Sequence, residues 1–287
     1  MAGMSLTDQE VADLVGLALR AVAAGDEDGR WQVVTHLHGE GGQPALDAAR
    51  ELCGHEQAAH RELGADILSQ VGGSKGPLRY AAVRALLDTA RDEQDPAVLR
   101  AIAVALGHRA DARAIPVFAR LRSHPAAEVR DAVAFGLLDL PERAANDILI
   151  ALSADPESGV RHWATFGLAR MTDADFPELR DALAARAGDA DLDTRVEAIH
   201  GLATRRDPRA LPALLDSLTV LDAADGDVDG NLVDEALFVL VASTGDPRLC
   251  PHVEARRVAW LADCPYEELP TDLRAAMARC AAVSPAG

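Results

Sequence analysis

The stretch VRHWATFGL, residues 160–168, decides the fold because its pattern recurs along most of the chain. Its central feature is an arginine that returns at intervals of 31, 39, 30, 31 and 34 residues. The equivalent arginines are Arg30, Arg61, Arg100, Arg130, Arg161 and Arg195, and Asp234 takes the same place 39 residues later. Self-similarity at such a period is typical of proteins built from stacked repeats.

Apolar residues around each arginine follow helical spacing. Counted from the arginine, they fall at positions −1, +3, +6 and +7, which form one stripe along a helix. Around Arg161 the stripe consists of Val160, Ala164, Gly167 and Leu168. The pattern predicts that each arginine lies on a helix whose stripe packs against other helices of the array.

A second phrase marks where the partner helices begin. DARAIP at residues 111–116, DPRALP at 207–212 and DPRLCP at 246–251 share an aspartate, an arginine two positions later and a final proline. Aspartate is a favoured N-cap, and proline is tolerated near the start of a helix. Each repeat is therefore predicted to contain an arginine-bearing helix and a proline-bearing helix.

Together these patterns predict an all-α fold, a right-handed α-solenoid of about seven helix pairs that forms one domain over residues 1–287. We expect the repeats to cover about 27–263. Capping helices are expected at about 5–24, where Thr7 and Glu10 match a capping box, and at about 271–282.

Composition limits the classes of function. The formal net charge is −18, which argues against binding nucleic acid, since that requires many cations to neutralise phosphates. No apolar run approaches the ~20 residues that span a bilayer, and no secretion signal is visible, so we expect a soluble cytoplasmic protein. The four cysteines lack the paired spacing of zinc sites or disulfide frameworks, and we expect neither.

The two alternating phrases resemble HEAT repeats, in particular the short bacterial subtype named after phycobilisome lyases. The resemblance covers about residues 27–263. It implies that the arginine-bearing helices line the concave side of the solenoid and that each arginine pairs with an aspartate in a loop. The family includes scaffolds, inhibitors, chromophore lyases and a di-iron hydroxylase, so the resemblance is more specific for fold than for function.

Helical geometry then indicates which residues face the groove. At 100° per residue, positions +1, +5 and +8 lie opposite the packed stripe. The candidate partner-binding residues are Trp31, Glu62, Asp66, Asp131, Phe135, His162, Phe166 and His200. Exposed aromatic rings usually mark a contact surface, and the acidic groups would attract a basic partner. Two alternatives stay open: curvature could bury position +5 against the next repeat, and the helix at 5–24 could cover Trp31.

The predicted function is accordingly a monomeric scaffold, adaptor or inhibitor that binds a protein or peptide in its groove. The alternative is an enzyme subunit of the chromophore-lyase type. It would need an acid–base pair, for which Asp66, Asp131, His162 and His200 are the candidates. The hydroxylase members of the resembled family hold iron with His-Glu pairs directly after the repeated arginine, and no copy in this sequence has both residues. We therefore expect no catalytic residues and no cofactor.

Two segments could hold a metal ion. Asp225, Asp227 and Asp229 match the first positions of an EF-hand calcium loop, but Ala236 replaces the bidentate glutamate at its twelfth position. The sequence thus leaves a choice between weak calcium binding and a solvated acidic loop. A histidine cluster at 36, 38, 55 and 60 is the other candidate, although its i,i+5 spacing is one residue too long for a zinc-protease helix.

Overall fold

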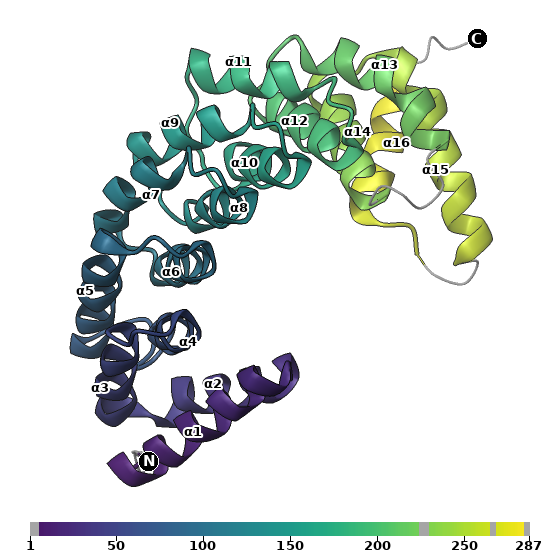
Figure 1. Ribbon diagram of the computed structural model, residues 1–287. Helices are drawn as coiled ribbons and strands as arrows, with labels where there is room; N and C mark the ends of the chain where they lie inside the picture. The colour runs from purple at the N-terminus through teal and green to yellow at the C-terminus, as the bar shows by residue number, and fades with distance from the viewer. Residues whose placement is uncertain (1–5, 224–229, 265–267, 284–287) are drawn as a thin grey trace. The chain divides into compact units, whose positions relative to one another are not determined.

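The structure, a computed structural model, describes residues 6–223, 230–264 and 268–283 (Figure 1). All regular elements in these ranges are helices, which confirms the predicted all-α solenoid fold. None of these helices is both long and apolar enough to cross a lipid bilayer. The tertiary contacts divide the chain into two compact units, Met1–Leu152 and Ser153–Gly287. That residues 1–287 form a single domain stays a prediction.

The unit Met1–Leu152 consists of a capping helix and two layers of helices (Figure 1). The arginine-bearing layer contains α2 (Glu27–Glu40), α4 (Ala58–Leu68), α6 (Pro96–Arg109) and α8 (Ala127–Gly136). The proline-bearing layer contains α3 (Gly42–Cys53), α5 (Pro77–Asp92), α7 (Ile115–Leu121) and α9 (Arg143–Leu152). Each helix packs on the next helix of its own layer.

The unit Ser153–Gly287 repeats this arrangement. Its arginine-bearing layer contains α10 (Ser158–Arg170), α12 (Leu192–Thr204) and α14 (Gly230–Thr244), and α16 (Thr271–Val283) packs against α14. Its proline-bearing layer contains α11 (Pro177–Arg186), α13 (Ala210–Ala223) and α15 (Cys250–Asp263). Short 3-10 helices at Ala112–Ala114 and Pro247–Leu249 precede α7 and α15, where the Asp-x-Arg phrase predicted helix starts.

The predicted capping helices are present. α1 spans Asp8–Ala24, and the Glu10 amide donates to Thr7 Oγ1 while the Thr7 amide donates to the Glu10 carboxylate. This is the expected capping box. The helix ends at Gly25, whose φ of 70° is the left-handed conformation that glycine adopts without strain. At the other end, α16 spans Thr271–Val283, against the predicted 271–282.

The predicted stripe forms the core of the array. The leucines at position +7 are fully buried: Leu37, Leu68, Leu137, Leu168 and Leu202. In α6 this position is Gly107, where an added Cβ would lie 2.7 Å from the Gly136 Cα of α8. The absence of a side chain thus lets the α6 and α8 backbones approach closely, which offsets the low helix propensity of glycine.

The expectation of no disulfide is wrong. Cys250 and Cys280 are bonded, with their Cα atoms 5.6 Å apart. Cys250 begins α15 and Cys280 lies near the end of α16, so the packing of these two helices joins residues that are 30 positions apart. Motif spacing cannot reveal such a pair. Cys53 is a free buried thiol, and burial raises its pKa to about 11.

Candidate functional site

The repeated arginine builds an ion-pair ladder in the unit Ser153–Gly287. Arg161 donates through Nε and Nη2 to the Asp189 carboxylate at 2.9 and 2.8 Å, and through Nη1 to the carbonyls of Asp155 and Pro156. The Asp191 amide also donates to Asp189. Burial by itself would raise the pKa of Asp189, but these hydrogen bonds hold it below its ordinary value. Arg161 is therefore a structural residue.

Arg61 makes the same set of contacts in the other unit. Its guanidinium binds the Glu93 carboxylate at 2.7 and 3.0 Å and donates to the carbonyls of His55 and Glu56. The predicted pairing of the arginine column with a loop aspartate is confirmed for Arg161, whereas for Arg61 a glutamate takes the place of the aspartate. Arg100 differs: it is 43% exposed and lies 3.4 Å from Glu62 on the preceding arginine-bearing helix, α4.

The two acidic candidates on α4 are held by arginines. Arg30 on α2 is buried and hydrogen-bonds both Asp66 and Glu27. Asp66 is only 7% exposed, so the prediction that it faces an open groove is wrong. Burial raises the pKa of Asp66 to about 7, although the Arg30 charge opposes the shift. Glu62 is partly exposed and lies between Arg30, at 3.9 Å, and Arg100.

The aromatic candidates of this unit are accessible. Trp31 is 41% exposed, so α1 does not cover its ring, and the Arg30 guanidinium lies 4.8 Å from the ring centroid. Phe135 is half-buried and meets His108 edge-to-face at 5.6 Å. Asp131, one turn before it, is also half-buried. Position +5 is thus half-buried in α8, whereas in α4 and α6 it is buried, at Asp66 and Ala105, as the alternative predicted.

The candidates His162 and Phe166 lie on α10 in the unit Ser153–Gly287, and both are half-buried. Trp163 connects them, with ring centroids 5.9 Å from each. The Trp163–Phe166 contact is edge-to-face, a favourable arrangement for aromatic rings. Sequence reasoning missed Trp163 because its +2 position was assigned to neither the stripe nor the groove.

A polar bridge that the sequence did not predict crosses three helices of this unit. Arg170 at the end of α10 donates to Glu197 of α12 at 2.5 Å and to Glu235 of α14 at 2.6 Å. Glu197 is buried, which raises the pKa of its carboxyl, whereas the Glu235 side chain is 50% exposed. Arg170 stands nine positions after Arg161, at 180° from it on a helix, so extending the angular analysis by one position would have found it.

Two cavities open beside this bridge. One, of about 720 Å³, is lined by His200 of α12, by Glu235, Phe238, Val239 and Ala242 of α14, and by Asp272, Ala275, Ala276 and Arg279 of α16. The other, of about 450 Å³, is lined by His200, Arg170, Thr204 and Arg205, among others. We call the side of the layer that carries Arg170, His200, Glu235 and Val239 the open face. Phe166 holds on α10 the position that His200 holds on α12.

His200 lines both cavities, and burial lowers its pKa to about 4, with the charge of Arg170 as a further cause. The imidazole is therefore neutral near pH 7. Its Nδ1 has no hydrogen-bond partner among the described residues, and the same holds for Nη2 of Arg170. Both atoms are themselves buried, so the bridge contains unsatisfied polar atoms within the described residues.

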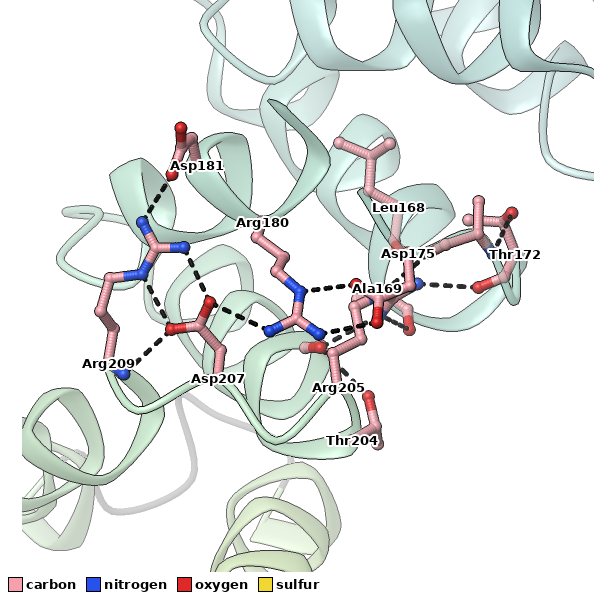
Figure 2. A network of polar contacts seen from close by, with 12 residues as sticks. Leu168, Ala169, Thr172, Asp175, Arg180, Asp181, Thr204, Arg205, Asp207 and Arg209 are labelled. Atoms are coloured by element: carbon pink, nitrogen blue, oxygen red, sulfur yellow. Dashed lines mark hydrogen bonds and ion pairs between the residues drawn. The ribbon is translucent and has the colours of Figure 1, made fainter. Parts of the chain in front are cut away.

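A second polar network, at the turn after α12, is complete (Figure 2). Arg205 donates its five N–H groups to the carbonyls of Leu168, Ala169, Thr172, Ala174 and Gly201, at 2.8–3.3 Å. Asp207 accepts two hydrogen bonds from Arg209 and lies 3.6 Å from Arg180. The hydrogen bonds from Arg209 hold the pKa of Asp207 at about 2. This network fixes the junction between repeats and leaves Arg205 no donor for a ligand.

The metal candidates have no support from the described residues. Asp225, Asp227 and Asp229 lie outside those residues. Across the ranges that are described, no group of three or more His, Cys, Asp or Glu side chains is arranged to hold an ion. The rings of His55 and His60 stack on each other at 3.9 Å.

Comparison with known proteins agrees with the fold. A model of HEAT repeats matches residues 145–228. Protein YibA of Escherichia coli K12 is 29% identical over 206 residues, which cover 69% of this chain and 73% of YibA. The match is to HEAT repeats in general, and the phycobilisome-lyase-like subtype stays a prediction.

Solved structures show the same HEAT-like fold. The crystal structure of E. coli YibA has a TM-score of 0.70 at 22% identity, and the match covers 98% of each chain. An engineered protein has a TM-score of 0.54 at 18% identity, over 96% of this chain and 78% of the engineered one. At these identities the likeness establishes the fold alone.

Proposed function

We propose that this HEAT-repeat protein is a scaffold, adaptor or inhibitor that binds a protein partner through the open face of its arginine-bearing layer. The observation that carries the proposal is the 720 Å³ cavity on that face. Phe238 and Val239 supply apolar contact area, while Glu235 and Asp272 supply carboxylates. An apolar floor with a polar edge is the usual anatomy of a protein-binding surface.

The chemistry of the face favours a partner segment with an apolar or aromatic anchor and a basic group. Phe166 is half-buried and therefore partly accessible, and aromatic residues are frequent hot spots. Glu235 and Asp272 are exposed enough to attract a cation from solution. The net charge of −18 would accelerate association with a basic partner and make it salt-dependent.

This proposal assigns no catalysis to the face. Of the four acid–base candidates, Asp66 is buried against Arg30, and His200 has a pKa of about 4, which makes it a weak base near pH 7. We also propose a monomer, and the cytoplasmic location expected from the sequence stays a prediction. The Cys250–Cys280 disulfide weighs against a strongly reducing compartment, since disulfides are rare there.

Affinity capture with quantitative mass spectrometry tests the function. The wild-type protein is compared with Phe166→Ala, with Phe135→Ala in the other unit, and with the control Val258→Ala, an exposed α15 residue outside the open face. We expect Phe166→Ala to retain its helical circular dichroism and lose the captured partner, while the control keeps it. Equal capture by wild-type and Phe166→Ala protein would overturn the assignment of this face.

A further inference from the structure

A second surface, on the proline-bearing layer of the unit Met1–Leu152, gathers arginines around an exposed aromatic ring. Tyr80 on α5 is 60% exposed, the largest exposure among the large apolar side chains of the described residues. The guanidinium carbons of Arg79 and Arg113 lie 5.9 and 5.7 Å from its ring centroid. Arginine beside an aromatic ring is stabilised by the cation–π interaction, so these contacts fix the ring and the charges together.

The ring forms part of a cavity of about 850 Å³ between α3 and α5. Three arginines, Arg50, Arg84 and Arg113, line the cavity together with one carboxylate, Asp88. Pro77 also lines it, which places the amino-terminal end of α5 at the cavity. The partial positive charge of a helix amino terminus has the same sign as the arginines.

The arginines differ in how far they are neutralised. Arg79 and Arg113 both bind Asp111, at 3.2 and 2.8 Å, so these two guanidiniums share one carboxylate and both take part in ion pairs. Arg50 and Arg84 are 60% and 82% exposed. They approach Asp47 and Asp88 only to 3.8 and 3.7 Å, beyond hydrogen-bond distance. The N–H groups of Arg50 and Arg84 are therefore available to a ligand.

The local charge is unusual for this chain. Four arginines (50, 79, 84 and 113) stand against three aspartates (47, 88 and 111), a balance of +1 on a chain of net charge −18. The cavity therefore has a small local excess of positive charge that can attract an anion. Because the attraction is between exposed groups, it must weaken as salt is added.

We propose that this cavity binds a small phosphate-bearing anion, with Arg50 and Arg84 as its ligands and Tyr80 as its apolar wall. A guanidinium presents a fork of two parallel N–H groups, and one carboxylate can accept both hydrogen bonds of one fork. A phosphate has enough oxygens to accept from two forks that come from different helices, here α3 and α5. The site lies in the other unit, on the proline-bearing layer, and involves none of the residues of the proposed partner-binding face.

Isothermal titration calorimetry with pyrophosphate tests the site on the full-length protein. Wild-type protein is compared with the double variant Arg50→Gln, Arg84→Gln and with the control Arg274→Gln, an exposed arginine on α16. We expect the double variant to bind at least about tenfold more weakly, because two charge-assisted contacts are lost. The control should bind as the wild type does, and added salt should weaken binding by the wild type.

A second titration uses ATP in place of pyrophosphate. If ATP binds more tightly than pyrophosphate and Tyr80→Ala removes this difference, the Tyr80 ring stacks on the base. If the two anions bind equally, the site contacts the phosphates alone. Both outcomes support the phosphate site. No binding of either anion to wild-type protein overturns the proposal. So does equal weakening in the Arg274→Gln control, which would indicate only general charge.

Discussion

Arg205 and Arg170 lie in the same unit, and the comparison between them separates architecture from binding. Arg205 has all five N–H groups matched to backbone carbonyls at the junction of two repeats (Figure 2). Arg170 bridges a buried and an exposed glutamate, keeps an unpaired Nη2 within the described residues and lines a cavity. The Arg205 network uses all its donors to hold the fold, whereas the Arg170 bridge ends on the exposed carboxylate of Glu235, which a partner can reach.

The Arg205 network has a counterpart in the other unit. Arg109 donates to the carbonyls of Leu68, Val71 and Gly73, and Asp111 binds Arg113 two residues later, as Asp207 binds Arg209. Both networks follow the sequence pattern Arg-x-Asp-x-Arg, at 109–113 and 205–209. The third Asp-x-Arg phrase, at 246–248, is preceded by Thr244 instead of arginine. Replacing the first arginine of this pattern is therefore the most direct test of whether the network holds the fold.

Arg205→Ala should have the largest effect. It leaves carbonyl groups at the repeat junction without their donors, and we expect a loss of about 3 kcal/mol or more in the free energy of unfolding. Urea denaturation followed by circular dichroism measures it. The control is the adjacent exposed residue in Arg206→Ala, which should stay near wild type. A variant at 205 that is as stable as the control would show that the network contributes little.

Asp207→Asn should have a smaller, pH-dependent effect. The pKa of Asp207 is lowered from 3.8 to about 2, chiefly by the hydrogen bonds from Arg209. Its folded-state pKa is depressed, so its contribution of about 2 kcal/mol is present above pH 4 and is lost as pH falls through about 2. The unfolding free energies of variant and wild type should converge across that window. Parallel curves would contradict the ion-pair account.

Reduction of the Cys250–Cys280 disulfide tests whether this bond stabilises the packing of α15 against α16. Denatured, unreduced protein should show two reactive thiols, those of Cys53 and Cys264, and reduced protein should show four. Cys280→Ser should lower stability by about 2 kcal/mol, since the cross-link restricts the unfolded chain. Four thiols in protein purified without reductant would show that the bond does not form.

Glu235→Gln should have the smallest effect on stability. The Glu235 side chain is half exposed and pairs with Arg170, which retains Glu197 as its buried partner. Exposed ion pairs contribute about 0–1 kcal/mol, so the melting curve should barely change. Capture of a basic partner should nevertheless fall, because the carboxylate charge is lost. A large loss of stability would place Glu235 with the architectural network instead.

The sequence predicts the features that depend on periodicity. The arginine column, the +7 leucines and the Thr7 capping box all follow from local spacing. Features that depend on how turns bend could not be predicted. Arg205 reaches five carbonyls because Arg206 adopts a φ of 53°, a left-handed conformation that no local pattern indicates. Position +9 of the arginine-bearing helix also belongs to the open face, as Arg170 shows.

Burial of charge is the other feature that the sequence hides. Asp66 occupies a groove position by angle, yet Arg30 of the preceding arginine-bearing helix binds it in the interior. The angle around a helix predicts the direction in which a side chain points. It does not predict whether a long side chain on a neighbouring helix, such as Arg30, reaches and covers it. The cysteine pair has the same origin, since only the packing of α15 on α16 brings Cys250 to Cys280.

Hydrogen exchange of the complex with a captured partner tests the central claim most directly. The claim is that the open face of α10, α12 and α14 binds the partner while the Arg205 network only holds the fold. We predict slower amide exchange on binding in α12, α14 and α16, around the cavity lined by His200 and Glu235. Peptides of α11 and the turn at Arg205–Arg209 should not change. Protection confined to that turn or to the proline-bearing helices, with none around the cavity, would contradict the account.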